Sequence, residues 1–463
     1  MRQTGDILLI SCYELGHQPL SLASPLGYLK SAGYPATALD AAVDKIPETA
    51  IRRARFIGLS VPMHTAMRVG MDITRHIRTI NKEAYLCFYG LYASLNADYL
   101  LSHGADAVIS GEYEQPLLDL ICTLETDAPI MVPGVRTLHH TSPPHLARQS
   151  FVKPDRSQLP ELKRYAHLDT GNHTLLAGYT EATRGCLHTC LHCPITPIYQ
   201  GRFFVVPRDI VLADIDQQVS LGARHMTFGD PDFLNGPTHS LKVLHAMHEA
   251  HPDLTFDFTT KVEHILEHPA FFSEARTLGG LFVISAIEST SDLVLDRLEK
   301  GHTRMDIDRA LEILGAADLP MRPSLVAFTP WTTLDGYLDM LIFIETHNLV
   351  DHIDSVQYTI RLLVPPGSAL LNHEETFTWL GSLDEKAFTY QWHHPDSRMD
   401  RLHQDVSELV EKADETKEDP ALTFYRIKQK ASALREDALL PLPTVVPFSK
   451  RRRVPRLTEA WFC

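Results

Sequence analysis

The sequence predicts an α/β protein with two sheet-forming units in tandem. Short apolar runs alternate with stretches of helical periodicity in residues 1–126 and again in residues 175–369, which is the pattern of βα units around parallel strands. A segment rich in proline and histidine lies between them and is typical of a linker, which we place at residues 127–174. Residues 370–463 carry helical patterns that end in an irregular, proline-containing tail. We therefore expect two α/β domains, a linker and a mainly helical C-terminal extension.

The N-terminal unit has the features of a small doubly wound domain. Apolar runs of strand length are separated by amphipathic stretches, and the ligand of such a domain lies at the carboxyl ends of its strands. The expected strands are Ile7–Ser11, Ala36–Leu39, Phe56–Val61, Tyr85–Tyr89 and Ala107–Ile109. The expected helices between and after them include Ala66–Thr79, Ala93–Ser102 and Gln115–Leu124.

The second unit has too few strands for a closed barrel. We expect six βα units, whereas a closed barrel of this type needs about eight. The expected strands are Leu175–Thr183, His225–Phe228, Thr255–Thr260, Leu281–Ile287, Met321–Phe328 and Ser355–Ile360. In the C-terminal extension, helices are expected around Met399–Ala413 and Thr423–Ala438.

Composition and charge exclude several classes of protein. With 463 residues, of which 44% are hydrophobic and 22% charged, the chain can bury a sizeable core. Its formal net charge of −15 argues against a nucleic-acid binder, because such binding depends on neutralising phosphates with Lys and Arg. No stretch approaches the roughly 18 apolar residues of a membrane span, and no secretory signal is recognised. We expect a cytoplasmic protein with neither nucleic acid nor a membrane as partner.

Three cysteines form the pattern CxxxCxxC just after the first strand of the second unit, where barrel enzymes place their chemistry. An iron–sulfur cube normally takes four thiolates, so Cys186, Cys190 and Cys193 would leave one iron open to a further ligand. A zinc site completed by His188 or His192 is the weaker alternative, because zinc motifs usually supply a fourth cysteine or a spaced histidine. A disulfide is disfavoured by the odd count of seven cysteines and the lack of an export signal.

This motif resembles the cluster motif of the radical S-adenosylmethionine (radical SAM) superfamily, with His192 where an aromatic residue is usual. The resemblance implies a [4Fe-4S] cluster whose open iron binds the amino and carboxylate groups of S-adenosylmethionine. It also implies reductive cleavage of this cofactor to a 5′-deoxyadenosyl radical, with an electron donor such as flavodoxin or ferredoxin as partner. The fold that it implies for residues 175–369 is a partial (β/α)6 barrel.

Further resemblances to this superfamily lie at the ends of the next strands. The segment containing Gly229, Asp230 and Asp232 is similar to the glycine/acid motif that receives the ammonium group of S-adenosylmethionine. We assign that role to Asp230, with Asp232 as the competing candidate, and the alternative is an Asp-Pro turn or helix cap.

The fourth strand ends in a Glu-Ser pair, Glu288 and Ser289, followed by a Lys-Gly ending at Gly301, as in the superfamily. The resemblance places Glu288 near the ribose hydroxyls or the amino acid end of the cofactor, and a salt bridge at the surface is the alternative. Lys261, after the third strand, lies where relatives often carry a basic residue.

The order of the two units resembles cobalamin-binding radical SAM enzymes. The N-terminal unit lacks the Asp-x-His-x-x-Gly loop of many cobalamin proteins and has Gly90 where relatives carry paired glycines. The segment Gly111–Glu114 matches the next loop of those relatives better. Both cobalamin binding and a domain that only shapes the pocket are compatible with these residues.

The last residues, Trp461, Phe462 and Cys463, are similar to the tail of the CUAEP/CCAEP-tail radical SAM proteins, in which this cysteine precedes selenocysteine or a second cysteine. The resemblance implies that translation continues through a UGA codon after Cys463. A selenol is far more acidic than a free thiol, so the pair would be a strong nucleophile and a soft-metal ligand. We take Cys463 as a candidate catalytic residue, and an incidental terminal cysteine is the alternative.

The sequence leaves three functions open. The first is radical chemistry, either methylation or rearrangement, on a small-molecule or peptide substrate. The second is transfer of a carbon fragment of S-adenosylmethionine to a soft element such as arsenic, with help from the tail. The third is a non-catalytic iron–sulfur redox protein.

Overall fold

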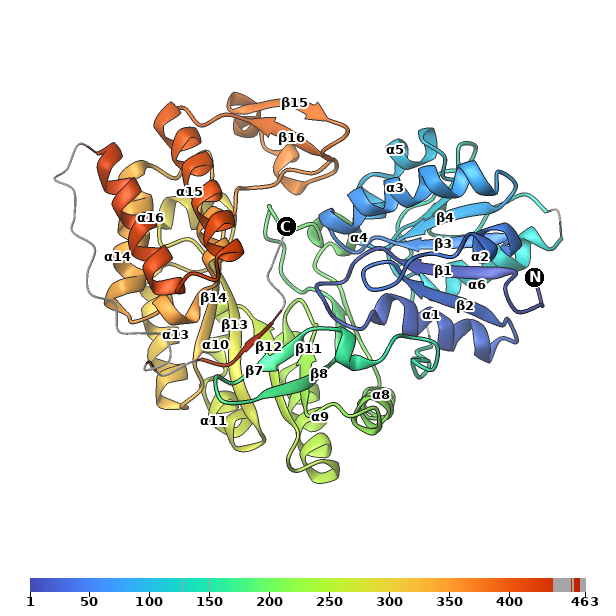
Figure 1. Ribbon diagram of the computed structural model, residues 1–463, viewed down its shortest axis with the longest axis horizontal. Helices are drawn as coiled ribbons and strands as arrows, with labels where there is room; N and C mark the ends of the chain where they lie inside the picture. Colours follow the sequence, from blue (N-terminus) through green and yellow to red (C-terminus); the bar gives the residue numbers. More distant parts are fainter. Residues whose placement is uncertain (127, 149, 436–450, 452–453, 459–463) are drawn as a thin grey trace.

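The computed structural model describes residues 1–126, 128–148, 150–435, 451 and 454–458. Figure 1 shows an N-terminal domain built around one sheet beside a larger domain built around a second sheet. The C-terminal helices α15 (Ser397–Glu415) and α16 (Pro420–Leu434) pack against the larger domain. No helix in the residues described is both long and apolar enough to cross a membrane.

The N-terminal sheet has the order β2-β1-β3-β4-β5-β6, in which β1 to β5 are parallel and β6 is antiparallel. The chain builds outward in both directions from β1 and β3, which flank the point where doubly wound domains bind their ligands. The strands are β1 (Ile7–Ser11), β2 (Ala36–Asp40), β3 (Phe56–Ser60), β4 (Tyr85–Tyr89), β5 (Ala107–Ile109) and β6 (Val135–Arg136). The first five agree with the predicted strands to within one residue, which confirms the doubly wound fold.

Helices cover both faces of this sheet because its parallel strands are apolar on both faces. Leu8 of β1 packs with apolar residues of the segments 66–77 and 97–101, whereas its neighbour Leu9 packs with apolar residues of the segments 22–29 and 117–121. The predicted helix Ala93–Ser102 is divided at Asn96 into two short helices. The helices are α1 (Leu20–Ser31), α2 (Glu48–Arg53), α3 (His64–Ile80), α4 (Leu91–Leu95), α5 (Ala97–Ser102) and α6 (Glu114–Leu124).

In the described part of the second domain, the sheet has the order β14-β13-β12-β11-β8-β7-β17. The strands β8 to β14 of this sheet are parallel, and β7 and β17 extend one edge as antiparallel strands. The strands are β7 (His167–Asp169), β8 (Thr174–Thr180), β11 (His225–Phe228), β12 (Thr255–Thr260), β13 (Gly280–Glu288), β14 (Met321–Leu325) and β17 (Arg456–Leu457). The sheet stays open, as expected for a partial barrel.

Helices follow the parallel strands and bury their apolar sides against the sheet (Figure 1). They are α8 (Arg208–Ser220), α9 (Pro237–Ala250), α10 (Val262–Glu267), α11 (Pro269–Thr277), α12 (Asp292–Arg297), α13 (Arg304–Ala316) and α14 (Leu334–Thr346). Between β8 and α8 lie a small antiparallel pair, β9 (Thr183–Gly185) with β10 (Phe203–Val205), and the short helix α7 (Thr196–Tyr199).

The prediction of a sixth barrel strand at Ser355–Ile360 is wrong. These residues form a 3₁₀ helix, η4 (Ser355–Thr359), in which the consecutive residues Gln357 and Tyr358 are both buried. The side-chain amide of Gln357 accepts a hydrogen bond from the backbone of Leu325 (2.9 Å), in place of a strand carbonyl. The chain regains parallel pairing only at one bridge, between Phe328 and Arg361.

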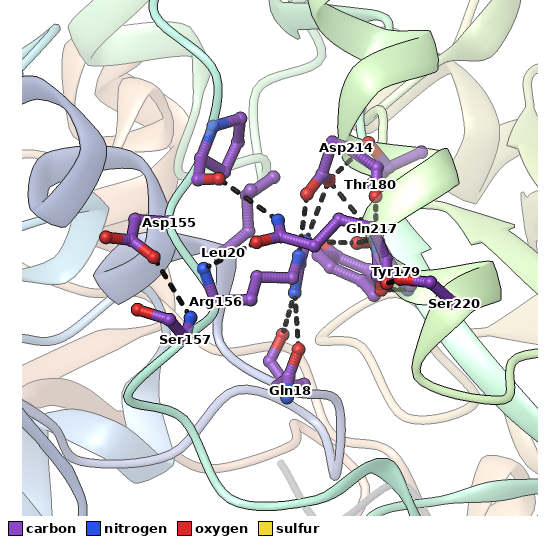
Figure 2. Close-up of polar contacts among 12 residues, drawn as sticks. Gln18, Leu20, Asp155, Arg156, Ser157, Tyr179, Thr180, Asp214, Gln217 and Ser220 are labelled. Carbon is purple, nitrogen blue, oxygen red and sulfur yellow. Dashed lines mark hydrogen bonds and ion pairs between the residues drawn. The ribbon is translucent and has the colours of Figure 1, made fainter.

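The segment expected as a linker contributes to both sheets, since β6 extends the first and β7 extends the second. Between them, Arg156 is fully buried and forms a two-point ion pair with Asp214 of α8 (Nε–Oδ1 2.7 Å, Nη2–Oδ2 2.9 Å). Figure 2 shows its guanidinium also donating to the carbonyl of Tyr179 in β8 (2.6 Å) and to the side chain of Gln18 (3.0 Å). Arg156 thus ties the connecting segment, the N-terminal domain and the barrel together.

The C-terminal extension is less helical than predicted. Besides α15 and α16 it contains a hairpin of β15 (Leu380–Asp384) and β16 (Thr389–Trp392). Phe388, in the hairpin turn, is buried in the core of the N-terminal domain and meets the ring of Tyr99 edge-on at 5.1 Å. The predicted helix Thr423–Ala438 is confirmed up to Leu434, and Cys463 lies outside the described residues.

Candidate functional site

The three cysteines lie on one loop, Cys186–Cys193, which follows β9 at the carboxyl end of β8. Neighbouring segments hold the backbone of this loop on several sides. Asn235 accepts from Leu187 N–H (3.0 Å), Leu298 accepts from Leu191 N–H (3.0 Å), and Thr196 donates to the carbonyl of Cys190 (2.8 Å). Hydrogen bonds to and from its backbone therefore hold the loop in place.

All three thiols are free; those of Cys186 and Cys190 are buried and that of Cys193 is half-buried. Burial raises the pKa of Cys186 to about 12 and that of Cys193 to about 11. Thiols in such a place ionise only beside a cation, so the set fits a metal centre that displaces their protons. His192 contacts the carboxylate of Glu288, which favours a set of three thiolates over a zinc site that the cysteines share with this histidine.

Asp230 follows β11 and has both carboxylate oxygens engaged. It accepts from the backbone of Ala182 (3.0 Å) and from the hydroxyl of Thr183 (2.7 Å), and also from the backbone of Thr183. Burial raises its pKa to about 7 in spite of these hydrogen bonds. The visible role of Asp230 is to hold the strand that leads into the cysteine loop. Binding of an ammonium group there stays a prediction.

Gly229 makes room for an aromatic ring. A Cβ atom at this position would lie 2.1 Å from the hydroxyl of Tyr179, whose ring stacks on His17 of the N-terminal domain at 4.4 Å.

Replacing Gly229 with alanine should therefore destabilise the protein by about 1–3 kcal/mol through overpacking. The matched control is Gly315→Ala in α13, where an added Cβ meets nothing within 4 Å, and helix propensity should give a gain of about 0.5–1 kcal/mol. Thermal unfolding of both variants checks the prediction, and equal midpoints would contradict it.

Asp232 and Lys261 lie at the ends of β11 and β12. Asp232 is fully buried and accepts from the hydroxyl of Thr260 (2.8 Å) through Oδ1, while its Oδ2 faces His188 (3.4 Å) and His264 (2.9 Å). Lys261 is buried and forms an ion pair with Glu263.

Glu288 ends β13 in a left-handed backbone conformation with φ of 61°, at a break in the ladder to β14. Its carboxylate lies 3.2 Å from Nζ of the buried Lys300 and 3.3 Å from Nε2 of His192 in the cysteine loop. Burial alone would raise the pKa of Glu288, but Lys300 and His192 lower it to about 2. A strained, buried and charged residue of this kind is typical of functional sites. Ser289 beside it is buried and caps the backbone of Ser291 (3.1 Å).

The structure thus brings the cysteine loop, Asp232, Lys261, Glu288 and Ser289 to one edge of the barrel sheet. The sequence motif included Lys300 in its Lys-Gly ending, but gave no reason to pair it with Glu288.

A second group that the sequence did not reveal joins the two domains. Arg184, two residues before Cys186, is buried and contacts Glu114 (2.5 Å) and Glu112 (3.3 Å) of the loop after β5. Tyr199 of α7 donates to Glu112 (2.8 Å). The segment Gly111–Glu114, which resembles a loop of cobalamin-binding relatives, is therefore anchored to the start of the cysteine loop.

Two buried hydroxyl groups lie at the carboxyl ends of β1 and β3. Ser11 and Ser60 are neighbours in the sheet, and neither Oγ atom has a hydrogen-bond partner among the described residues. Gly90, after β4, has φ of 103°, and a Cβ atom there would lie 3.0 Å from the backbone of Val61. Orphaned hydroxyls at the switch point of a doubly wound sheet fit a bound ligand that supplies polar partners.

The fold of the chain is that of the cobalamin-dependent radical SAM enzymes, with a doubly wound domain before a partial barrel. The chain is similar to OxsB, a cobalamin-dependent S-adenosylmethionine radical enzyme solved with aqua-cobalamin bound. The TM-score is 0.70 at 14% identity, and the match covers 94% of this chain and 74% of OxsB.

It is also similar to TsrM from Kitasatospora setae, a radical S-adenosylmethionine methyltransferase solved with cobalamin and a [4Fe-4S] cluster. Here the TM-score is 0.61 at 15% identity, over 75% of this chain and 71% of TsrM. No family model and no curated protein matches the sequence.

Proposed function

We propose that the chain is a radical SAM enzyme that cleaves S-adenosylmethionine at a [4Fe-4S] cluster held by Cys186, Cys190 and Cys193. The observation that carries this proposal is the placement of the three free thiols. They lie on a rigid loop at the carboxyl end of the first barrel strand, in the fold shared with OxsB and TsrM. Three thiolates leave one iron for the amino acid end of the cofactor.

S-adenosylmethionine would then lie along the ends of β11, β12 and β13. When bound, the cluster supplies one electron to the sulfonium and cobalamin supplies a carrier for a methyl group. The chain's own part is to offer charge at fixed positions: Glu288 is held as a carboxylate by Lys300, and Lys261 offers a buried ammonium group. Such groups bind a zwitterionic cofactor well because they are desolvated before it arrives.

Cobalamin is the ligand we propose for the N-terminal domain. The unpartnered hydroxyls of Ser11 and Ser60 and the close approach at Gly90 fit a large polar ligand at the carboxyl ends of β1, β3 and β4. The ion pairs of Arg184 with Glu112 and Glu114 would keep this domain in register with the cysteine loop.

The substrate class is a small molecule or a peptide, and the reaction is a methylation or a rearrangement. We propose a flavodoxin or ferredoxin as electron donor and the reducing cytoplasm as location.

A second candidate is transfer of a carbon fragment to arsenic with help from Cys463. One observation supports this candidate: β17 runs in the same direction as β8, so its carboxyl end at Leu457 points toward the edge that carries the cysteine loop. Product analysis with and without arsenite separates this reaction from the first, and genomic sequence past the codon of Cys463 tests for UGA.

The test of the main proposal is anaerobic reconstitution with iron and sulfide, followed by S-adenosylmethionine and a strong reductant. We expect about four irons per chain and formation of 5′-deoxyadenosine or, for methyl transfer, S-adenosylhomocysteine. A protein that carries the cluster yet consumes no S-adenosylmethionine would instead be a redox protein.

Glu288→Gln should weaken S-adenosylmethionine binding by about 10- to 100-fold, because a hydrogen bond to a charged group contributes about 1.5–3 kcal/mol. Equilibrium dialysis with labelled cofactor measures this loss, and iron content should stay at the wild-type value. Glu274→Gln, on an exposed pair with His245, is the control and should bind normally. Unchanged affinity in Glu288→Gln would remove this residue from the cofactor site.

A further inference from the structure

Two histidines and an aspartate from three elements converge beside the cysteine loop. His188 comes from that loop, Asp232 from the turn after β11 and His264 from α10. The distance from Asp232 Oδ2 is 2.9 Å to His264 Nδ1 and 3.4 Å to His188 Nε2. The three side chains can each offer one ligand atom, and these atoms all lie within 4.8 Å of one another.

The facing atoms of this group are buried and lack hydrogen bonds. His188 Nε2, Asp232 Oδ2 and His264 Nδ1 have no hydrogen-bond partner of good geometry among the described residues, although they lie this close together. A buried polar atom left unpaired costs about 1–3 kcal/mol. A cation bound between these three atoms would give each of them a partner.

The outward atoms of the group are held by neighbouring residues, as the ligands of a metal site usually are. Asp232 Oδ1 accepts from the hydroxyl of Thr260 (2.8 Å) and the backbone of Leu234 (3.1 Å), which leaves Oδ2 pointing inward. The other ring nitrogen of His188 lies 3.4 Å from the carboxylate of Glu263. A carboxylate behind a histidine is the usual way in which proteins orient a metal ligand.

We propose that His188, Asp232 and His264 bind one divalent transition-metal ion, separate from the iron–sulfur cluster. Ligand atoms at about 2.1 Å from zinc or iron(II) lie about 3.0–3.4 Å from one another, close to the spacings around Asp232 Oδ2. Two histidines and a carboxylate leave coordination positions open, as in catalytic zinc and non-haem iron sites. Such an ion would share the loop of the cysteines and offer a position for water or a substrate oxygen.

Zinc content tests this proposal without reference to catalysis. Cluster-loaded protein is dialysed against zinc, and metals are counted by mass spectrometry. We expect the wild-type chain to hold about one zinc in addition to the irons. His264→Ala and Asp232→Asn should lose this zinc and keep the irons. Glu263→Gln, a milder change that spares all three ligands, should weaken zinc binding by about tenfold or more. His245→Ala, in the exposed pair with Glu274, is the matched control and should keep its zinc.

The chain with all three cysteines replaced by alanine separates this site from the cluster. Retention of zinc in that variant supports the site, and its loss places zinc on the thiolates and overturns the proposal. Uptake that is unchanged in both His264→Ala and Asp232→Asn also overturns it. The proposal is also overturned if the wild-type chain takes up no zinc and Asp232→Asn no longer binds S-adenosylmethionine. Asp232 would then be the partner of the ammonium group of that cofactor. The iron content reports on the cluster separately, so each zinc result can be interpreted whether or not the cluster forms.

Discussion

Replacement of any one of Cys186, Cys190 and Cys193 with alanine is expected to abolish the [4Fe-4S] cluster. The loop offers three thiols in one place, and its backbone is fixed by neighbouring segments, so no other cysteine of the described chain can take over a vacant position. Cluster assembly with two thiolates and two exposed irons should fail. We expect the brown absorbance and the iron content after anaerobic reconstitution to fall to background, and product formation from S-adenosylmethionine to fall by at least about a thousandfold, since the electron source is gone.

The control for this prediction is Cys87→Ala. Cys87 is fully buried in β4 of the other domain, where its thiol lies in an apolar core and donates to the backbone carbonyl of Phe88 at 3.7 Å. This variant should lose about 1 kcal/mol of stability and keep its iron. Iron retained in a Cys186, Cys190 or Cys193 variant at the wild-type level would refute the assignment of the cluster to this loop.

The parallel strands of both sheets were predictable because parallel strands buried on both faces are short apolar runs. Ile7–Ser11 and Tyr85–Tyr89 were placed to the residue for this reason. The same reasoning failed at Ser355–Ile360, a run of strand length that forms a 3₁₀ helix. There the side chain of Gln357 replaces a ladder bond, and nothing in a local pattern shows that a distant backbone amide will find a side-chain acceptor.

The candidate site was predictable where its residues lie close together in the sequence. The three cysteines are separated by few residues, so their convergence follows from the sequence alone. Partners that are far apart were not predictable. Arg184 meets Glu114 across 70 residues, and His188 meets His264 through Asp232. No periodicity links such positions, because only the strand order of the folded sheet places their ends together.

These long-range contacts link the cysteine loop to both domains. The cysteine loop is preceded by Arg184, which is bound to the N-terminal domain, and it contains His192, which is bound to the end of β13 through Glu288. A shift of either domain would move the loop. The loop is thus held by ion pairs before its first cysteine and between its last two.

Arg156→Met is expected to have the largest effect on stability. The guanidinium is wholly inaccessible to solvent, and its removal leaves the equally buried carboxylate of Asp214 without a counter-charge. Breaking one side of a buried ion pair costs about 3–5 kcal/mol. The carbonyl of Tyr179 and the side chain of Gln18 lose a donor in the same step (Figure 2). We expect a clear fall in the urea midpoint and faster proteolysis between the two domains.

Two further variants separate charge from packing in this prediction. Adding Asp214→Asn to Arg156→Met removes the unpaired charge and still leaves an oxygen that can accept from Thr180, so it should restore a large part of the lost stability. Arg75→Met breaks the exposed ion pair with Asp72, whose side chains are 74% and 71% exposed, and should change stability by no more than about 0.5 kcal/mol. Equal urea midpoints for Arg156→Met and Arg75→Met would show that the buried contacts of Arg156 do not hold the domains together.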